Sequence, residues 1–460
     1  MKTRIITLIF AFVASLSTAF SATIIDGISY SFNTSNQTAM VTTGGTYTGD
    51  VVIPETVTYE DITYTVTYIG VNAFRNCTDL TSIVIPNSVV GIGERAFLGC
   101  SGLTSLSSPN SVTTISDYAF NSCTGLTSVV IGDGVISIGS SSFNECSKIA
   151  SLHIGNSVAT ISGNAFRLCK ALTSVTIPNS VIFIGQYAFQ ACSGLTSITI
   201  GSGVNDIRSF AFLDCSNLKS VHIHDLEAWC GISFGSADAN PLCYAYRLYF
   251  DDAEITDLVI PDGILSVNKY AFYNCKSLRN VVIPNGVTMI DESAFAGCVN
   301  IASVTLPSGV TSYGKYAFSN CLSLNVIHDY RTTPVKVGET VFASVNKPFC
   351  TLYVPSSAVE TYQAADIWKD FYIVPFDFNT YAITATATNG KVAGTGTFGE
   401  GASVELTATA NAGYRFTQWS DGNTDNPRMV TVTEDKQYTA MFTKVAFNIT
   451  VNQNCNVTVK

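Results

Sequence analysis

The sequence predicts a mainly β protein in which a solenoid of 23-residue coils is followed by a small all-β domain. Three observations support this prediction. An Ala-Phe-x-x-Cys-x-x-Leu unit recurs along most of the 460-residue chain. A short stretch of alternating apolar and polar residues, typical of a half-buried strand, follows each unit. Beyond Pro375 the composition shifts to threonine, alanine and glycine in short alternating runs, which indicates a separate β domain.

Residues 1–21 have the features of a secretory signal peptide. Lys2 and Arg4 precede a mostly apolar run from Ile5 to Leu16, and small residues stand at the −3 and −1 positions of a cleavage site after Ser21. This run is too short to span a bilayer, and no later run approaches the roughly 18 apolar residues that a membrane helix needs. We therefore expect an exported chain without a membrane-spanning segment, whose residues 22–65 form an N-terminal β cap.

The composition is that of a folded, acidic protein. Apolar residues make up 47% of the chain and charged residues 13%, far from a disordered composition. The formal net charge is −10, and such a chain repels the phosphates of nucleic acids. We expect no nucleic-acid partner.

The repeat has a period of 23 residues. Alanine precedes the phenylalanine in nine of ten units, with Ser142 as the exception, and cysteine follows three residues later in all ten. The phenylalanines are Phe74, Phe97, Phe120, Phe143, Phe166, Phe189, Phe212, Phe272, Phe295 and Phe318. A period in the twenties with a Leu-x-x-Val-x-Ile core is typical of a leucine-rich-repeat solenoid. We expect this solenoid over residues 66–376, with parallel β ladders joined by short helical or 3₁₀ turns.

Each coil is expected to contribute a half-buried strand. In residues 172–178, Val175 and Ile177 alternate inward while Thr176 points outward, and Pro178 ends the strand because it cannot donate to a ladder. Fixing the backbone costs about 1–2 kcal/mol per residue, more than the apolar side chains of one coil recover. The coils are therefore stable only when they stack.

The segment LTSVTIPNSVIFIGQYAFQAC resembles the BspA-like leucine-rich repeats found in surface and secreted proteins of bacteria and some protozoa. The irregular insert at residues 224–257 and the closing segment 350–376 resemble the insert and C-terminal cap of that family. Phe342 heads a degenerate last unit, with Val345 in place of cysteine. The resemblance implies an exported, non-enzymatic, adhesin-like surface protein that binds extracellular or host proteins.

The recurring cysteines have three possible roles. They fill space as small hydrophobic side chains, form disulfides between coils, or bind metal. Stacked Cβ atoms would lie about 4.8 Å apart, whereas a disulfide needs about 3.5–4.5 Å, and a linear column does not converge on zinc as four ligands must. We expect space-filling thiols, with no metal and no cofactor. Whether Cys230 and Cys243 of the insert form a disulfide stays open.

The outward column of the strands is the candidate ligand-binding site. It includes Val130, His153, Thr176, Thr199 and His222, beside a neighbouring column of serines. Two interpretations remain open: an extended recognition face, or hydroxyl groups that simply suit a solvated parallel sheet. His153 and His222 lie three coils apart, roughly 14 Å, and cannot share a metal. His222 and His224 are expected to form a solvated pair at the start of a loop.

No catalytic motif is present. The sequence has no nucleophile elbow, phosphate-binding glycine loop or His-Glu-x-x-His pattern, so we expect no enzyme. Three functional hypotheses remain: a protein-binding adhesin, a structural spacer, and a glycan-binding surface module.

Residues 381–443 predict a small antiparallel β domain. Val404 and the residues that alternate with it point inward, and the segment GYRFTQWSDG resembles the divergent internalin B-repeat-like module of bacterial surface proteins. Tyr414, Phe416 and Trp419 are then core residues, with sugar stacking as the alternative role for Trp419. Residues 447–460 resemble the start of a truncated second copy, so the mode of anchoring stays open.

Overall fold

The computed structural model describes residues 22–377, 379–399 and 403–445. The expected signal peptide and the expected second copy of the β module lie outside the described residues. The chain divides into two compact units, 1–253 and 254–460, and each is described by itself. Among the described residues, no helix has the length and apolar character needed to cross a membrane.

Antiparallel strands begin the first unit and lead into its parallel coils. Strand β6 (Ile62–Ile69) pairs antiparallel with β5 (Thr56–Tyr59) but parallel with β3 (Thr38–Val41) and with the first coil. Strand β2 (Ile28–Asn33) pairs with both β3 and β1 (Thr23–Ile25), and β4 (Gly49–Val52) pairs with β7 (Leu80–Val84) of the first coil. The cap therefore shares its hydrogen-bond ladder with the coils.

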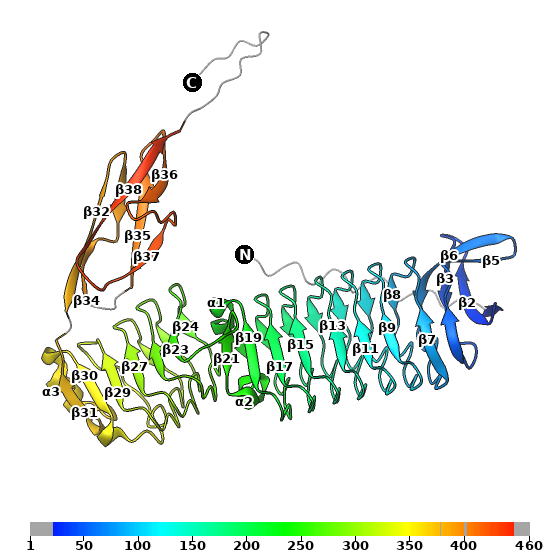
Figure 1. Cartoon of the computed structure of the whole chain (residues 1–460), viewed down its shortest axis with the longest axis horizontal. Coiled ribbons are helices and arrows are strands. Elements are labelled where there is room, and N and C mark those ends of the chain that lie inside the picture. The colour runs from blue at the N-terminus through cyan, green and yellow to red at the C-terminus, as the bar shows by residue number, and fades with distance from the viewer. Residues whose placement is uncertain (1–21, 378, 400–402, 446–460) are drawn as a thin grey trace, which may run out of the picture. The chain divides into compact units, whose positions relative to one another are not determined.

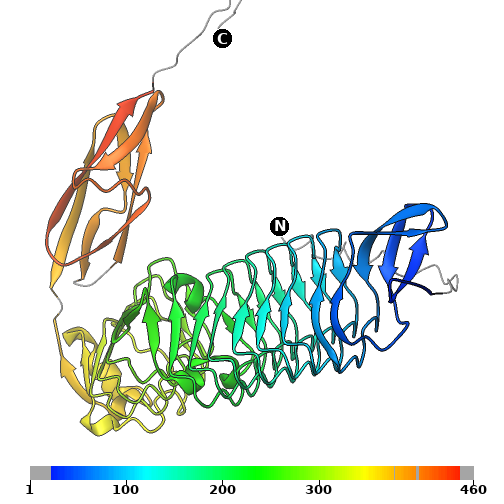
Figure 2. The same cartoon turned by 45° about the vertical axis from the view of Figure 1, so that its right-hand side comes forward.

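Each coil of the first unit contributes one strand to each of two parallel ladders (Figure 1). The outer ladder, whose outward side chains include the candidate site, is divided into three stretches. They are β7 (Leu80–Val84), which pairs with β4; then β9 (Ser105–Ser107), β11 (Ser128–Val130) and β13 (Ser151–His153); and then β15 (Ser174–Ile177), β17 (Ser197–Ile200), β19 (Ser220–Ile223) and β21 (Leu248–Phe250). The second ladder consists of β8 (Gly91–Ile92), β10 (Thr114–Ile115), β12 (Ser137–Ile138), β14 (Thr160–Ile161), β16 (Phe183–Ile184), β18 (Asp206–Ile207) and β20 (Ser233–Phe234). Figure 2 shows these coils stacked in register, as the predicted solenoid requires.

A stack of phenylalanine rings fills the interior of each array. From Phe74 to Phe212 the rings of successive coils lie parallel, with centroids 4.8–5.5 Å apart and interplanar angles of 3–15°. In the second unit the stack runs from Phe272 to Phe342 at 5.2–5.7 Å. These rings are buried, so the repeat places the same side chain at the same depth in every coil.

The cysteines of the coils are buried thiols that also donate hydrogen bonds. The Sγ atom of Cys100 donates to the carbonyl oxygen of Phe74, one coil earlier, at 3.0 Å. Seven further cysteines repeat this bond at 3.0–3.5 Å: Cys123, Cys146, Cys169, Cys192, Cys215, Cys298 and Cys321. The two exceptions, Cys77 and Cys275, head their arrays, where no such phenylalanine precedes them.

No disulfide is present among the described cysteines. The expectation of thiols packed as small apolar groups agrees with this arrangement, and the donated hydrogen bond adds a reason for cysteine that the sequence alone did not reveal. Cys230 is buried, and the Sγ atom of Cys243 lies 3.6 Å from Asp238 Oδ1. The two cysteines of the insert are therefore not joined.

The turns that carry each Ala-Phe pair are hydrogen bonded in one direction. Two residues with positive φ flank the phenylalanine, such as Arg95 at 54° and Gly99 at 77° around Phe97. Their amides and that of Phe97 donate to three carbonyls of the next coil at 2.7–3.0 Å. Bonds from residue i to i−3, such as Cys100 N to Phe97 O, close the turn, but the left-handed residues prevent a continuous helix.

The expected irregular insert is an elongated coil that caps this row of amides. Its strands β20 and β21 continue both ladders, and α1 (Leu226–Cys230), η1 (Ala237–Ala239), α2 (Leu242–Ala245) and β22 (Ala253–Glu254) fill the added length. The amides of Phe210, Phe212 and Asp214 donate to Ser236 Oγ, the Asp238 carbonyl and the Tyr244 hydroxyl at 3.0–3.2 Å. The insert therefore supplies the acceptors that a further regular coil would supply.

In the second unit, residues 254–376 form a similar array. One ladder has β23 (Asp257–Val259), β25 (Asn280–Val282), β27 (Ser303–Leu306), β29 (Val326–Asp329), β30 (Thr351–Val354) and β31 (Tyr372–Pro375). The other has β24 (Ser266–Val267), β26 (Met289–Ile290) and β28 (Ser312–Tyr313). The closing elements are η2 (Lys347–Phe349), η3 (Ser356–Ala358), α3 (Val359–Ala364) and η4 (Trp368–Asp370).

Aromatic and charged side chains close this second array. Trp368 and Phe371 contact the last ring of the stack, Phe342, edge-on at 5.5 and 5.3 Å. Beside them Arg331 and Asp329 form a buried ion pair, in which Arg331 Nε donates to Asp329 Oδ1 at 2.7 Å. Arg331 also donates to the Val310 carbonyl at 3.0 Å, so the buried charge is both paired and hydrogen bonded.

Residues 380–444 form two small sheets. One has the order β34 (Gly396–Gly399), β32 (Thr380–Ala387), β38 (Lys436–Lys444) and β36 (Tyr414–Trp419), and the other has β33 (Gly390–Ala393), β35 (Ser403–Ala410) and β37 (Arg428–Thr431). The pairings are antiparallel as expected, except that the first and last strands, β32 and β38, pair in parallel.

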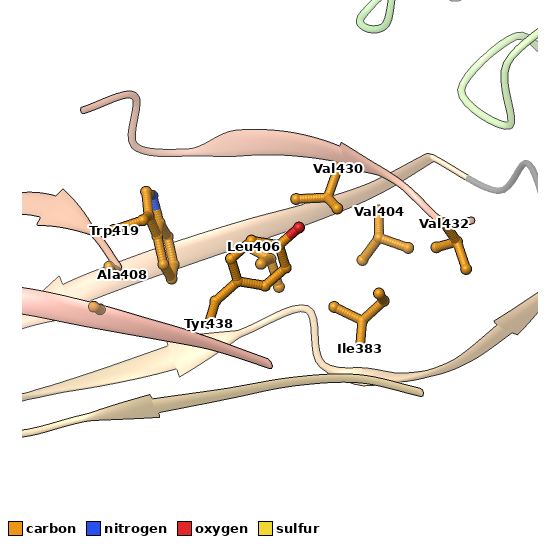
Figure 3. Close-up of a cluster of buried hydrophobic side chains, with 9 residues drawn as sticks. Ile383, Val404, Leu406, Ala408, Trp419, Val430, Val432 and Tyr438 are labelled. Atoms are coloured by element: carbon orange, nitrogen blue, oxygen red, sulfur yellow. The ribbon is translucent and has the colours of Figure 1, made fainter. Parts of the chain in front are cut away.

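Figure 3 shows the core of this module around Trp419 and Tyr438. Trp419 is 0% exposed, and its Nε1 atom donates to the Asp425 carbonyl at 2.9 Å. This burial confirms Trp419 as a core residue and contradicts the sugar-stacking alternative. Phe416 packs against the cluster while half-buried, and Tyr414 is half-buried outside it.

The coil thiols are expected to resist alkylation in the folded protein. Burial raises the pKa of Cys146, Cys215 and Cys321 to about 12, and only the thiolate reacts. At about pH 8, iodoacetamide should label these thiols on the order of a thousandfold more slowly than an exposed reference thiol made by Thr176→Cys. Mass spectrometry of peptides measures the labelling, with denatured protein as the positive control. Equal labelling of Cys146 and the reference would contradict the buried column.

Loss of the Tyr244 hydroxyl is expected to weaken the cap on the first array. Tyr244→Phe removes the acceptor of the Asp214 amide and a 3.2 Å bond to Asp238, each contributing about 0.5–1.5 kcal/mol. Amide hydrogen exchange over residues 207–216 should become faster. The control is Tyr118→Phe, at a side chain that is 37% exposed. Unchanged exchange in Tyr244→Phe would show that the insert is not the cap.

Candidate functional site

The five candidate residues all lie on the solvent side of the outer ladder. Val130 is 40% exposed, His153 and Thr176 are exposed, and Thr199 and His222 are half-buried. Val130 pairs in register with His153, and Thr176 pairs with Thr199, which pairs with His222. Strands β13 and β15 do not pair. The structure therefore assembles a group of two and a group of three rather than one continuous ladder.

Many of the neighbouring hydroxyl groups are used within the sheet. Thr127 Oγ1 donates to the Thr104 carbonyl at 3.1 Å, and Thr196 Oγ1 donates to the Thr173 carbonyl at 3.0 Å. Ser220 Oγ donates to Ser197 Oγ at 3.1 Å. For these columns, the interpretation that hydroxyl residues suit a solvated sheet accounts for the sequence.

The hydroxyl groups of Thr176 and Thr199 differ from these neighbours. Within the described part of the chain, neither hydroxyl has a hydrogen-bond partner. Their in-register pairing places them one strand apart, about 4.8 Å. They offer two adjacent donors and acceptors to a ligand.

His222 contacts the insert as well as facing solvent. Its ring stacks on Tyr249 with centroids 4.8 Å apart, and its nitrogens face Ser220 Oγ at 3.0 Å and Asp252 Oδ1 at 3.4 Å. His224 Nδ1 likewise lies 2.9 Å from Asp251 Oδ1. Sequence reasoning expected a solvated histidine pair and missed these contacts.

The second unit carries the same Thr-His-Tyr order in its own outward column. Thr305 pairs with His328, which pairs with Tyr353, and the two rings stack at 4.8 Å and 11°. Phe376 lies across both rings, 5.6 and 5.7 Å away. Burial lowers the pKa of His328, so this imidazole is neutral at physiological pH. The repeat pattern reaches Thr305 and His328, but the irregular spacing from His328 to Tyr353, 25 residues instead of 23, hid Tyr353 from it.

A metal site and a nucleophilic thiol are the other chemical candidates. No group of three or more His, Cys, Asp or Glu side chains within the described ranges is arranged to hold a metal. The thiols with a raised pKa carry little thiolate, the form that acts as a nucleophile. The arrangement presents weakly charged sheet faces to solvent.

Comparison with known proteins identifies both parts of the chain. The family described as BspA type leucine rich repeat region matches residues 55–172, 113–230 and 246–364, and the divergent InlB B-repeat domain matches residues 381–446. No curated protein sequence matches the chain.

The chain is also similar to several solved structures. A leucine-rich repeat protein from Bacteroides ovatus is 23% identical, with 77% of this chain and 100% of that one covered and a TM-score of 0.44. A leucine rich cell surface protein from Faecalibacterium prausnitzii is 23% identical, with coverage of 72% and 95% and a TM-score of 0.37. The pneumococcal vaccine antigen PcpA is 18% identical, with coverage of 78% and 99% and a TM-score of 0.40.

The repeat match spans more than half of the chain and agrees with the 23-residue coils, the phenylalanine stack and the parallel ladders. The protein therefore belongs to the BspA-type leucine-rich-repeat family, and its C-terminal module is a divergent InlB B-repeat domain.

Proposed function

We propose that this chain is an exported, non-enzymatic, adhesin-like surface protein that binds extracellular proteins through the outward ribbon. The outward ribbon is the set Val130, His153, Thr176, Thr199 and His222. The observation that carries the proposal is the in-register pair of solvent-facing Thr176 and Thr199, whose hydroxyls have no hydrogen-bond partner among the described residues. The hydroxyls of Thr127, Thr196 and Ser220, in contrast, donate within the sheet. Solenoids commonly use such extended faces for recognition.

The surroundings of this pair support a protein ligand. The ribbon has no Lys, Arg, Asp or Glu, and Val130 contributes exposed apolar surface, as the contact areas of protein interfaces do. Family membership and the expected signal peptide favour a location at the cell surface or outside the cell. A glycan-binding role and a purely structural spacer role are the alternatives.

Lysine substitutions on the ribbon should abolish capture of the ligand. The test variant combines His153→Ala, Thr176→Lys and Thr199→Lys, and the control Ile182→Lys/Asn205→Lys adds the same two charges to the same coils away from the ribbon. Binding to a panel of purified extracellular-matrix proteins is measured by biolayer interferometry. We expect at least a roughly tenfold loss for the test variant, about 1.4 kcal/mol, and none for the control.

Two results would contradict this proposal. Equal binding by the test variant and the wild-type chain would remove the ribbon as the site. Failure of the wild-type chain to bind any matrix protein would favour the spacer role.

A further inference from the structure

The six-stranded sheet of the second unit has a solvent face that changes character along its length. Two outward columns form this face. The first column is Asp257, Asn280, Ser303, Val326, Thr351 and Tyr372, and the second is Val259, Val282, Thr305, His328, Tyr353 and Val374. Hydrogen-bonding side chains occupy one end, and aromatic rings occupy the other.

At the polar end the side chains are ordered by one another. Ser303 Oγ donates to Asn280 Oδ1 at 2.7 Å, and Asn280 Nδ2 donates to Asp257 Oδ1. Thr256 Oγ1 donates to the other oxygen of Asp257 at 2.9 Å. The hydrogen bond from Asn280, followed by that from Thr256, lowers the pKa of Asp257. The row therefore ends in a carboxylate that lies beside the amide of Asn280 and the hydroxyl of Thr256.

At the aromatic end three rings form one group, the aromatic cluster of His328, Tyr353 and Phe376, in which the first two are half-buried and the third is exposed. The first two rings are stacked, and Phe376 lies at 70° and 67° to them while 39% exposed. Tyr372, on the neighbouring strand, is 61% exposed. Exposed aromatic surface at one end of a sheet face points to an interaction there.

The polar side-chain atoms of His328 and Tyr353 face no partner among the described residues. No other described residue hydrogen bonds to the ring nitrogens of His328 or to the hydroxyl group of Tyr353. A neutral imidazole offers one donor and one acceptor, and a phenol offers both. The first unit differs at this point, because both nitrogens of His222 already face protein oxygens.

We propose that the aromatic cluster, with Thr305, Ser303 and Asn280 beside it, binds a neutral oligosaccharide. A pyranose presents C–H groups on its face, which suit the negative face of an aromatic ring, and hydroxyl groups at its edge, which suit amide, hydroxyl and imidazole partners. The two columns have no lysine or arginine, so an acidic glycan or a phosphate finds no counter-charge there. This site is separate from the outward ribbon and does not depend on the proposed protein-binding function.

The test uses the full chain on a microarray of neutral oligosaccharides of glucose, galactose, mannose and N-acetylglucosamine, printed beside sulfated and sialylated forms and apolar peptides. Titration calorimetry then measures the affinity for the strongest neutral glycan. We expect Phe376→Ala to weaken binding at least tenfold. The matched control is Phe250→Ala in the first unit, whose ring is 37% exposed and whose loss should leave the affinity unchanged.

A second variant separates recognition from folding. Tyr353→Phe keeps the stacked ring and removes only the hydroxyl, and we expect several-fold weaker binding with an unchanged unfolding temperature. The proposal is overturned if no neutral glycan binds, if only acidic glycans or apolar peptides bind, or if Phe376→Ala binds the neutral glycan as well as wild type. Because the outward ribbon variants lie in other coils, their capture results are independent of these outcomes.

Discussion

The parallel stacking of phenylalanine rings is the interaction on which the rest of the structure depends. Successive rings about 5 Å apart hold the coils at one spacing and one rotation. Once two coils share that register, each cysteine thiol reaches the phenylalanine carbonyl of the coil before it. The turn amides then meet the carbonyls of the next coil. A single coil has none of these partners, which is why stability lies in the contacts between coils.

The one-directional turn bonds give each array ends that must be closed by different chemistry. The turn of a regular coil accepts hydrogen bonds from the coil before it and donates hydrogen bonds to the coil after it. The last regular coil of the first unit has no regular coil after it to accept the hydrogen bonds of its turn amides. Ser236, Asp238 and Tyr244 of the insert supply oxygen atoms at these positions. In the second unit, aromatic side chains cover the last ring, and a satisfied buried ion pair lies beside them. The insert interrupts the repeat in sequence, but it supplies the acceptors that the last regular coil needs.

The repeat pattern predicts the coil, its inward residues and its outward columns, because every unit repeats the same choice at the same position. In the C-terminal module, alternation predicts buried Val404 and the resemblance of GYRFTQWSDG implies buried Trp419, and both are buried, whereas Tyr414 and Phe416 are only half-buried. The repeat pattern does not predict contacts that occur once. Tyr249 and Tyr353 stack on histidines of the preceding strand, but 27 and 25 residues separate the paired strand positions instead of 23, so neither tyrosine falls on the period. The repeat pattern also does not predict the hydrogen bond of each thiol. The spacing of the residues determines how deeply the cysteine side chain is buried, but not where its S–H group points.

A double-mutant cycle on the stack tests the central claim most directly. Urea unfolding of the wild-type chain, Phe166→Ala, Phe189→Ala and the double variant gives the coupling between two rings in contact. Adjacent rings should couple by about 0.5–1.5 kcal/mol. The pair Phe97 and Phe189, four coils apart, should be additive within about 0.5 kcal/mol. Equal coupling for the two pairs, or additivity for the adjacent pair, would contradict a structure held together by contacts between neighbouring coils.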